Sequence, residues 1–388
     1  MNITKKLKII FLYSTVFFIL SLLTAYLPMW LNKEFNLSTI TIGFLLGIVG
    51  VVKIFSSFFI TKKIINDIYL QIALKCLAII ISLIFILILL LDKNEYYYIL
   101  FILIFLSLLL FAPIIPISET FCLEQNDNFN NSYGKVRLAG SVSFFLGVMI
   151  FGKLIDMYSI KIFPIICFIS SLFLLLCTFS LQKRKNLKPE MLYENKLKQL
   201  IKRKFIITII IFCSIIQSCH AMYYGFSTIL WVENGLDYSQ IGFLWGWGVV
   251  AEIILFYKVG GFKIRNHFRK LLILCGIVSA SRWLFTFITV NFYFLFILQT
   301  FHAISFAFTH YLLMYFIYNY VPKNLRLISN YFYSALSGGF FMLILSILCG
   351  VTYNWSEKGF GFLLMSLICF MSIFILFKKK ESYVDVNK

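Results

Sequence analysis

Twelve apolar stretches, each about 20 residues long and separated by short polar loops, constrain this chain more than any other feature. A helix rises about 1.5 Å per residue, so each stretch can cross a hydrocarbon layer about 30 Å thick. The sequence therefore predicts an all-α membrane protein with twelve transmembrane helices. The predicted spans are 9–31, 38–60, 68–91, 97–120, 136–157, 159–181, 205–231, 238–258, 271–289, 292–318, 327–350 and 359–377.

The composition excludes a soluble domain of this size, because 61% of the residues are hydrophobic and only 13% are charged. The nine cysteines are scattered singly, without the spacing of a zinc site or of a disulfide framework. We therefore expect no metal and no bound cofactor.

The net charge of +19 follows the loops rather than a binding face. Of the 35 Lys and Arg residues, 26 lie in the termini and in alternate loops on one side, and 4 lie in the loops of the other side. This bias predicts that both termini are cytoplasmic. It argues against nucleic acid as a partner, and leaves the lipid bilayer and a small-molecule substrate as the expected partners of a monomeric protein.

The two halves of the chain resemble each other. Residues 42–47 (Ile-Gly-Phe-Leu-Leu-Gly) match residues 241–246 (Ile-Gly-Phe-Leu-Trp-Gly) in the corresponding span of the second half. We expect two six-helix halves related by pseudo-two-fold symmetry about an axis along the membrane normal. The predicted boundaries are 1–181 for the first half, 182–204 for a basic cytoplasmic linker, 205–377 for the second half and 378–388 for a cytoplasmic tail.

Ionisable residues inside the spans are costly, which makes them candidates for function. Glu252 and Lys53 lie too deep to reach their helix ends, so they either face a polar cavity or form a buried structural pair. Arg282 lies mid-span in a chain that otherwise prefers lysine, which indicates a need for a planar, bidentate cation. Glu119 and Arg137 form either a substrate site or a salt bridge at the cytoplasmic ends of their helices.

Aromatic and imidazole groups are the next candidates. His302 shares its span with His310, and it either makes an interhelical hydrogen bond or takes part in proton transfer, since histidine titrates near physiological pH. His220 is followed by Tyr223 and Tyr224, whose rings could stack on a substrate or simply fill the bundle.

Three motifs resemble those of the bacterial 3-phenylpropionate permease group of the major facilitator superfamily, near lactose permease and the nucleoside–proton symporters. They are Tyr133-Gly-Lys-Val-Arg137-Leu-Ala-Gly-Ser-Val, His220-Ala-Met-Tyr-Tyr-Gly-Phe-Ser and Gly248-Val-Val-Ala-Glu252-Ile-Ile-Leu-Phe. The resemblance runs from Leu27-Pro-Met-Trp to the last span, and it implies the major facilitator fold and alternating access.

The same resemblance implies roles for single residues. The 18-residue spacing of Glu119 and Arg137 matches the substrate-binding pair of lactose permease, and His302 matches its helix 10 histidine. Glu252 and Arg282 match its helix 8 glutamate and helix 9 arginine. The position of its proton-carrying glutamate is Ser305 here, so the resemblance and the burial of Glu252 make that residue the expected proton carrier.

The sequence thus predicts a secondary active transporter of a bacterial inner membrane, and not an enzyme. The expected activity is proton-coupled uptake of a small organic solute, either an aromatic carboxylate such as 3-phenylpropionate or a sugar or nucleoside. The proton motive force is the expected source of energy. The expected substrate-binding residues are Glu119, Arg137, Lys53, His302, Tyr223 and Tyr224, and the expected proton-coupling residues are Glu252, Arg282 and His302. A proton-driven efflux antiporter is the alternative, followed by a membrane-embedded enzyme or a sensor.

The topology can be tested by thiol labelling of single-cysteine variants in intact cells. A cysteine placed in the linker 182–204 should react only with reagents that enter the cytoplasm, because the basic loops stay inside. Labelling of that cysteine by an impermeant reagent from outside would reverse the predicted orientation.

Overall fold

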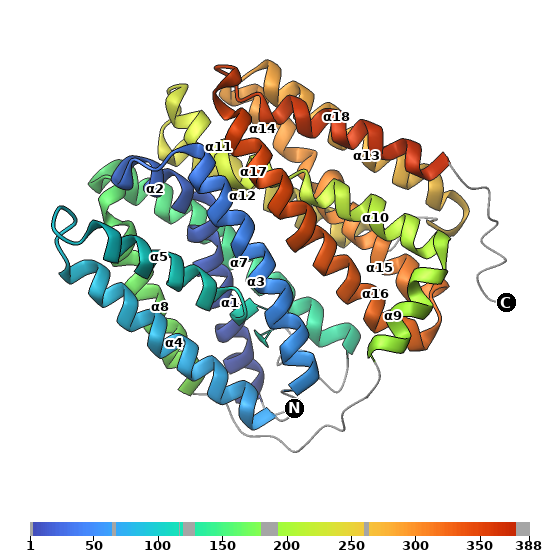
Figure 1. Ribbon diagram of the computed structural model, residues 1–388, viewed down its shortest axis with the longest axis horizontal. Helices are drawn as coiled ribbons and strands as arrows, with labels where there is room; N and C mark the ends of the chain where they lie inside the picture. Colours follow the sequence, from blue (N-terminus) through green and yellow to red (C-terminus); the bar gives the residue numbers. More distant parts are fainter. Residues whose placement is uncertain are drawn as a thin grey trace. The chain divides into compact units, whose positions relative to one another are not determined.

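The computed structural model describes residues 3–63, 67–115, 117–118, 129–179, 193–259 and 264–377, and the regular elements in these residues are all helices (Figure 1). In a hydrocarbon layer no water is present to satisfy backbone N–H and C=O groups, so each segment must satisfy its own groups by forming a helix. The expected all-α architecture is confirmed.

The chain divides into two compact units. The first consists of Met1–Asn36, Phe55–Pro189 and Asp237–Gly246, and the second of Leu37–Ile54, Glu190–Leu236 and Trp247–Lys388. The helices of the first unit are α1 (Ile3–Ala25), α2 (Leu27–Phe35), α4 (Asp67–Leu90), α5 (Tyr97–Phe111), α7 (Phe129–Tyr158), η1 (Ile160–Ile162) and α8 (Phe163–Phe179). Within it α1 packs on α7 and α8, and α4 packs on α5 and α8.

The second unit contains the more heavily interrupted helices. They are α9 (Tyr193–Lys202), α10 (Lys204–Ser218), α11 (Ala221–Glu233), α13 (Ile264–Ile288), α14 (Phe292–Thr300), η3 (Ala303–Phe308), α15 (Thr309–Tyr320), α16 (Lys323–Ala335), η4 (Leu336–Phe340), α17 (Phe341–Thr352), η5 (Tyr353–Trp355), α18 (Gly361–Ile373) and η6 (Phe374–Phe377). Two helices, α3 (Thr39–Lys63) and α12 (Tyr238–Lys258), contribute residues to both units. The predicted division into two six-helix halves concerns an internal repeat rather than these contacts, and it stays a prediction.

Among the described residues, nine helical stretches are long and apolar enough to cross a membrane. Three shorter apolar helices, Thr39–Val52, Tyr97–Phe111 and Gly361–Phe377, lie where three further spans were predicted. The membrane-spanning character of the chain is therefore confirmed, and every predicted span overlaps an apolar helix in the described residues.

Several predicted spans are not continuous α-helices. In the first unit, the span 9–31 is interrupted at Tyr26, between α1 and α2. The span 205–231 is interrupted at Cys219–His220, between α10 and α11. The spans 292–318 and 327–350 contain the π-helical segments η3 and η4. An apolar stretch has the same hydropathy whether its turns are α or π, so the sequence pattern could not reveal these interruptions.

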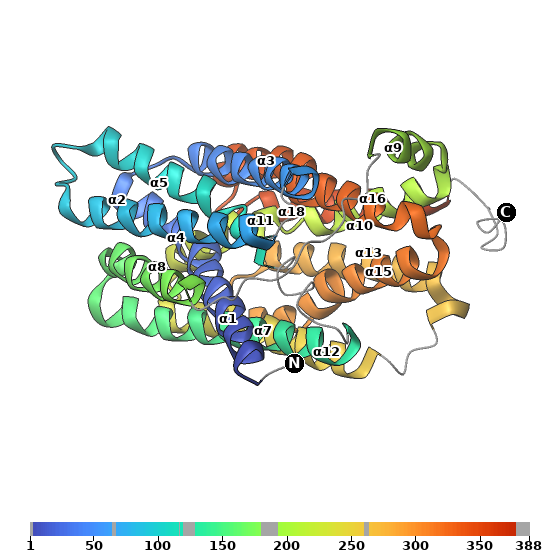
Figure 2. The same cartoon turned by 90° about the horizontal axis from the view of Figure 1, so that it is seen from below.

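The basic linker is partly helical. Its last part forms α9, an amphipathic helix that lies beside α16 in the second unit (Figure 2). Leu200 is buried on one face of α9, and Lys198 and Lys202 are exposed. The helix therefore packs one side against the helical bundle and keeps its charged side outward.

The glycines of the repeated motif allow close backbone contacts in each unit. In the second unit, a Cβ atom on Gly43 would collide with the carbonyl oxygen of Ser346 on α17. In the first unit, a Cβ atom on Gly242, at the matching repeat position, would collide with the carbonyl oxygen of Val148 on α7. Small residues at such crossings let helices approach closely where dispersion, rather than the hydrophobic effect, favours association.

A carboxylate of α7 caps the start of α12. The Asp156 carboxylate accepts hydrogen bonds from the backbone N–H groups of Tyr238 (2.9 Å) and Ser239 (2.8 Å), and also from the Ser239 hydroxyl. The first N–H groups of a helix have no partner within it, and they favour a negative charge. Asp156 thereby fixes the end of α12, the helix that also contains Glu252.

Candidate functional site

The most costly side chain in the second unit is the guanidinium of Arg282, on α13. It is 2% exposed and is surrounded by apolar helices. A cation removed from water in this way must recover its hydration through hydrogen bonds or an opposite charge. The partners of Arg282 therefore define the site.

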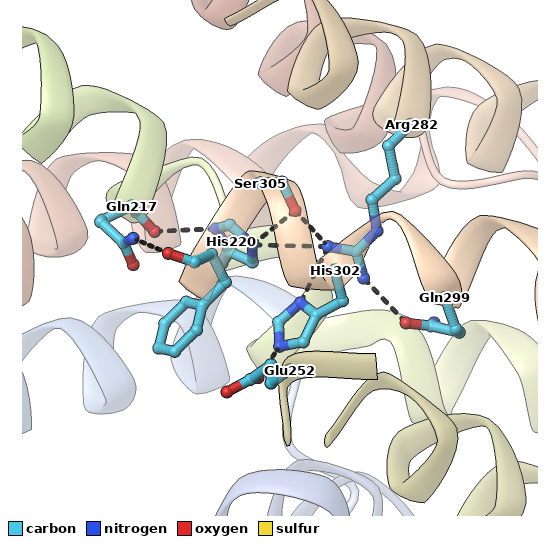
Figure 3. A network of polar contacts seen from close by, with 8 residues as sticks. Gln217, His220, Glu252, Arg282, Gln299, His302 and Ser305 are labelled. Atoms are coloured by element: carbon cyan, nitrogen blue, oxygen red, sulfur yellow. Dashed lines mark hydrogen bonds and ion pairs between the residues drawn. The ribbon is translucent and has the colours of Figure 1, made fainter. Parts of the chain in front are cut away.

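Four polar side chains surround this guanidinium (Figure 3). Its Nη1 group lies 2.9 Å from His302 Nδ1, 2.9 Å from Ser305 Oγ and 3.4 Å from His220 Nε2. Its Nη2 group donates to Gln299 Oε1 at 2.8 Å. None of these four partners is a carboxylate, so neutral acceptors replace the water that Arg282 has lost.

Two aromatic rings complete the environment of the cation. The guanidinium carbon lies 4.3 Å from the ring centroid of Trp283 and 5.1 Å from that of Tyr223. Cation–π contacts of this kind contribute about 0.5–2 kcal/mol each, with the larger values at desolvated sites. Together the rings and the acceptors allow Arg282 to remain charged in an apolar bundle.

The carboxylate of the network belongs to Glu252, which contacts one of these partners, His302. Glu252 Oε1, on α12, lies 2.9 Å from His302 Nε2, and the two side chains are 13% and 7% exposed. Arginine can only donate, so His302 Nδ1 must accept the hydrogen bond from Arg282. His302 is therefore neutral, with its proton on Nε2, and this N–H donates to Glu252.

His220 has the opposite tautomer. Its Nδ1 atom lies 3.2 Å from the carbonyl oxygen of Ile216 and 3.1 Å from that of Gln217, so Nδ1 must donate. Its Nε2 atom is then the acceptor that faces Arg282 and the Ser305 hydroxyl, which lies 3.4 Å away. The network thus has a defined direction of hydrogen bonding through two neutral histidines.

The arrangement can accept a proton at Glu252 without losing the contact between Glu252 and His302. A proton added to Glu252 Oε2 leaves Oε1 able to accept from His302 Nε2. A proton added to His302 Nδ1 would instead oppose the N–H groups of Arg282 and place two cations in contact. In the described part of the chain, no group of three or more His, Cys, Asp or Glu side chains is placed to hold a metal ion.

The structure brings together several residues that the sequence singled out. Arg282, His302 and Glu252 form one hydrogen-bonded chain, and Tyr223 lies against the Arg282 cation. The ring of Tyr224 stacks on His220 at a centroid distance of 5.7 Å. These five expected residues are therefore neighbours.

Other expected residues lie elsewhere or outside the description. His310 is separate from the network and contacts the Tyr333 hydroxyl at 3.2 Å. Glu119 lies outside the described residues. Lys53 and Arg137 lie in the helices α3 and α7, and the structure describes their backbone but not their side chains. The Glu119–Arg137 pair therefore stays a prediction.

Sequence reasoning did not mention Gln217 or Gln299, and it noted Ser305 only as the position of a glutamate in lactose permease. Gln299 and Ser305 bond the guanidinium directly, and Gln217 bonds His220 through its backbone carbonyl. All three are buried polar groups within predicted spans. That property was a usable signal, because a polar amide or hydroxyl in a membrane helix needs a partner.

Comparison with known proteins gives results over nearly the whole chain. The family model described as the MFS_1 like family matches residues 5–364. An Escherichia coli (strain K12) protein described as a probable 3-phenylpropionic acid transporter is 27% identical over 371 residues, which cover 94% of this chain and 95% of that protein.

Solved structures show the same fold at low identity. The nucleoside transporter NupG superposes with a TM-score of 0.79 at 14% identity, covering 98% of this chain and 100% of that chain. A D-xylose-proton symporter superposes with a TM-score of 0.71 at 11% identity, covering 96% and 97%. The expected major facilitator fold is confirmed.

The tautomers of the two histidines can be tested by nitrogen-15 NMR of histidine-labelled protein in lipid. We expect His302 to be protonated at Nε2 and His220 at Nδ1, because each other ring nitrogen faces a donor. Variants His302→Asn and His220→Asn assign the signals. A doubly protonated His302 at neutral pH would contradict the hydrogen-bond directions given above.

Proposed function

Because the chain belongs to the MFS_1 like family, we propose that it is a proton-coupled symporter that imports a small organic acid. That it is a membrane transporter, and not an enzyme, follows from the family and from its relatives. The proton coupling, the direction and the substrate are the proposal. The observation that supports it best is the chain of contacts from Glu252 through His302 to Arg282.

Glu252 is the proposed proton carrier. Its carboxyl group is partly exposed, and its protonation leaves the bond to His302 intact. Burial favours the neutral form of a carboxyl group, and a nearby cation favours the charged form. A carboxyl group balanced between these two influences can change protonation as its surroundings alternate, which a symporter requires.

Charge balance suggests why an anion would accompany the proton. With Glu252 ionised, its charge compensates that of Arg282, and the network is neutral overall. When Glu252 is protonated, the charge of Arg282 is uncompensated, and an approaching carboxylate is favoured in these apolar surroundings. By linkage, a bound carboxylate favours the protonated state to the same degree. This reciprocity supports an organic acid over a neutral solute.

The aromatic carboxylate class has further support from the name of the E. coli relative. In this proposal Arg282 acts at a distance, because its donors already bond four side chains and its faces contact rings. Direct substrate contacts are assigned to Arg137, Glu119 and Lys53 together with His302, and aromatic contacts to Tyr223 and Tyr224. A sugar or nucleoside substrate is the alternative outcome of the substrate screen described below.

We place the transporter in a bacterial inner membrane with both termini in the cytoplasm. The support is the excess of Lys and Arg in alternate loops and the bacterial origin of the relative named above. The proposed working form is a monomer that uses alternating access and needs no cofactor.

Glu252→Gln tests the coupling in proteoliposomes. The variant should lose uphill, proton-driven uptake of 3-phenylpropionate by at least about 100-fold, while exchange of substrate across the membrane is retained, because exchange needs no net proton movement. A counterflow screen of the unaltered protein with aromatic acids, sugars and nucleosides first fixes the substrate. Concentrative uptake by Glu252→Gln under a proton gradient would transfer the proposed role to Glu119.

Glu119→Gln and Arg137→Lys test the proposed substrate pair. Each should reduce exchange as well as uphill uptake, because an uncompensated charge remains in the first case and the bidentate fork is lost in the second. The matched control is Arg326→Lys, at the start of α16, where the native side chain donates to the carbonyl oxygen of Val321 and lies over the ring of Tyr318. Exchange at the unaltered rate in either test variant would make the pair a structural salt bridge.

A further inference from the structure

Three helix interruptions gather around the end of α10. The helix itself stops at Ser218, and α11 begins at Ala221. The π-helical segment η3 contains Ser305, and it follows directly after His302. The second π-helical segment, η4, packs against α10, α16 and α17. Interruptions of this kind are often found at functional sites, where they redirect side chains.

Consecutive residues of α10 bond both π-helical segments. Gln217 Nε2 donates to the carbonyl oxygen of Phe306, in η3, at 2.7 Å. Ser218 Oγ lies 2.8 Å from the carbonyl oxygen of Ser337, in η4, and 2.7 Å from that of Ser214 in its own helix. The side-chain bonds therefore cross from a regular helix end to the irregular turns of two neighbours.

Gln217 also contacts the network from the other direction. Its backbone carbonyl accepts the Nδ1–H group of His220, and the two residues lie next to each other in Figure 3. One residue thus bonds η3 through its side chain and His220 through its main chain. Both His220 and Ser305 of η3 face the Arg282 guanidinium.

The register of η3 determines which side chains reach Arg282. Each α-helical residue turns the chain by about 100°, so removing one π turn would rotate Ser305 relative to His310 by about that angle. His302, just before η3, and Ser305, within it, bond Arg282. His310, which follows η3 in the chain, bonds Tyr333. All these contacts can coexist only while η3 keeps its π turn.

We propose that Gln217 is a positioning residue for the Arg282 network, and that Ser218 joins the same helix end to η4, so that the three interrupted helices keep one common register. Gln217 does not contact the proton or the substrate in this assignment. It acts by holding Ser305 and His302 against Arg282. The transport measurement rests on the proposed function, whereas the measurement of hydrogen exchange does not.

The structural readout is amide hydrogen exchange of the segment 303–308 in the purified protein in lipid. Gln217→Met keeps the length of the side chain but has no donor, and it should speed exchange in this segment by about tenfold, as expected for one buried hydrogen bond. Thr39→Val is the matched control, because it removes a buried hydroxyl bond to the carbonyl oxygen of Gly350, 2.9 Å long, outside the network. Unchanged exchange of 303–308 in Gln217→Met would overturn the proposal.

The functional readout is the pH profile of 3-phenylpropionate uptake in proteoliposomes. Gln217→Met should move the midpoint by about half a pH unit or more, because His302 and Glu252 would no longer be held in place. The Thr39→Val control should leave the midpoint of the pH profile unchanged. A lower maximal rate in Gln217→Met with an unchanged midpoint would contradict a positioning role.

Three further variants keep the test decisive if Gln217→Met does not fold. Ser218→Ala should accelerate exchange in 336–340, and Ser218→Thr, which retains the hydroxyl, should restore the native rate. Gln217→Asn retains the amide but is too short, so it should resemble Gln217→Met. If Glu252→Gln still concentrates substrate while these exchange effects are observed, the coupling proposal fails and the positioning role stands.

Discussion

The burial of one cation determines the organisation of the second unit. Arg282 is 2% exposed, and the apolar helices around it offer no solvent. A direct salt bridge would have been one solution, but buried pairs often gain little over their desolvation cost. The protein instead surrounds the guanidinium with neutral acceptors and two aromatic rings, and the carboxylate of Glu252 is reached only through His302. Each of the helices α12, α13 and α14 contributes a side chain to this arrangement.

The irregular helices follow from the geometry that the contacts of Arg282 require. A regular helix places neighbours on one face only at spacings of three and four residues. His302 lies just before η3 and Ser305 within it, and the interruption between α10 and α11 allows His220 to approach from another helix. Irregular backbone inside a membrane needs compensating hydrogen bonds, and side chains of α10 supply them. The polar network and the helix interruptions therefore depend on each other.

The fold could be predicted from the sequence because its determinants are local. Apolar length, loop charge and the glycine motif can each be recognised within short stretches of the sequence. The comparisons confirm the fold that these features indicate. For the site, the cost of a buried charge singled out Arg282 and Glu252, and the titration of histidine near physiological pH singled out His302. The acceptors Gln299 and Ser305 were not predicted, because a neutral polar residue in a membrane helix has many possible partners. Only the packing of α13 against η3 selects Arg282 as theirs.

Ser305 shows how one residue type changes the electrostatics of such a site. A carboxylate at this position, in contact with Arg282, would hold the cation in a direct ion pair, and its protonation would break that pair. With a hydroxyl there, Arg282 keeps all its bonds whichever protonation state Glu252 adopts. The neutral His302 transmits the change only as a change of potential, since it donates to either form of the carboxyl group. In the proposed function, a proton at Glu252 then alters the charge that an anionic substrate meets without rearranging the groups that hold Arg282, and the geometry of the network remains constant while its net charge alternates.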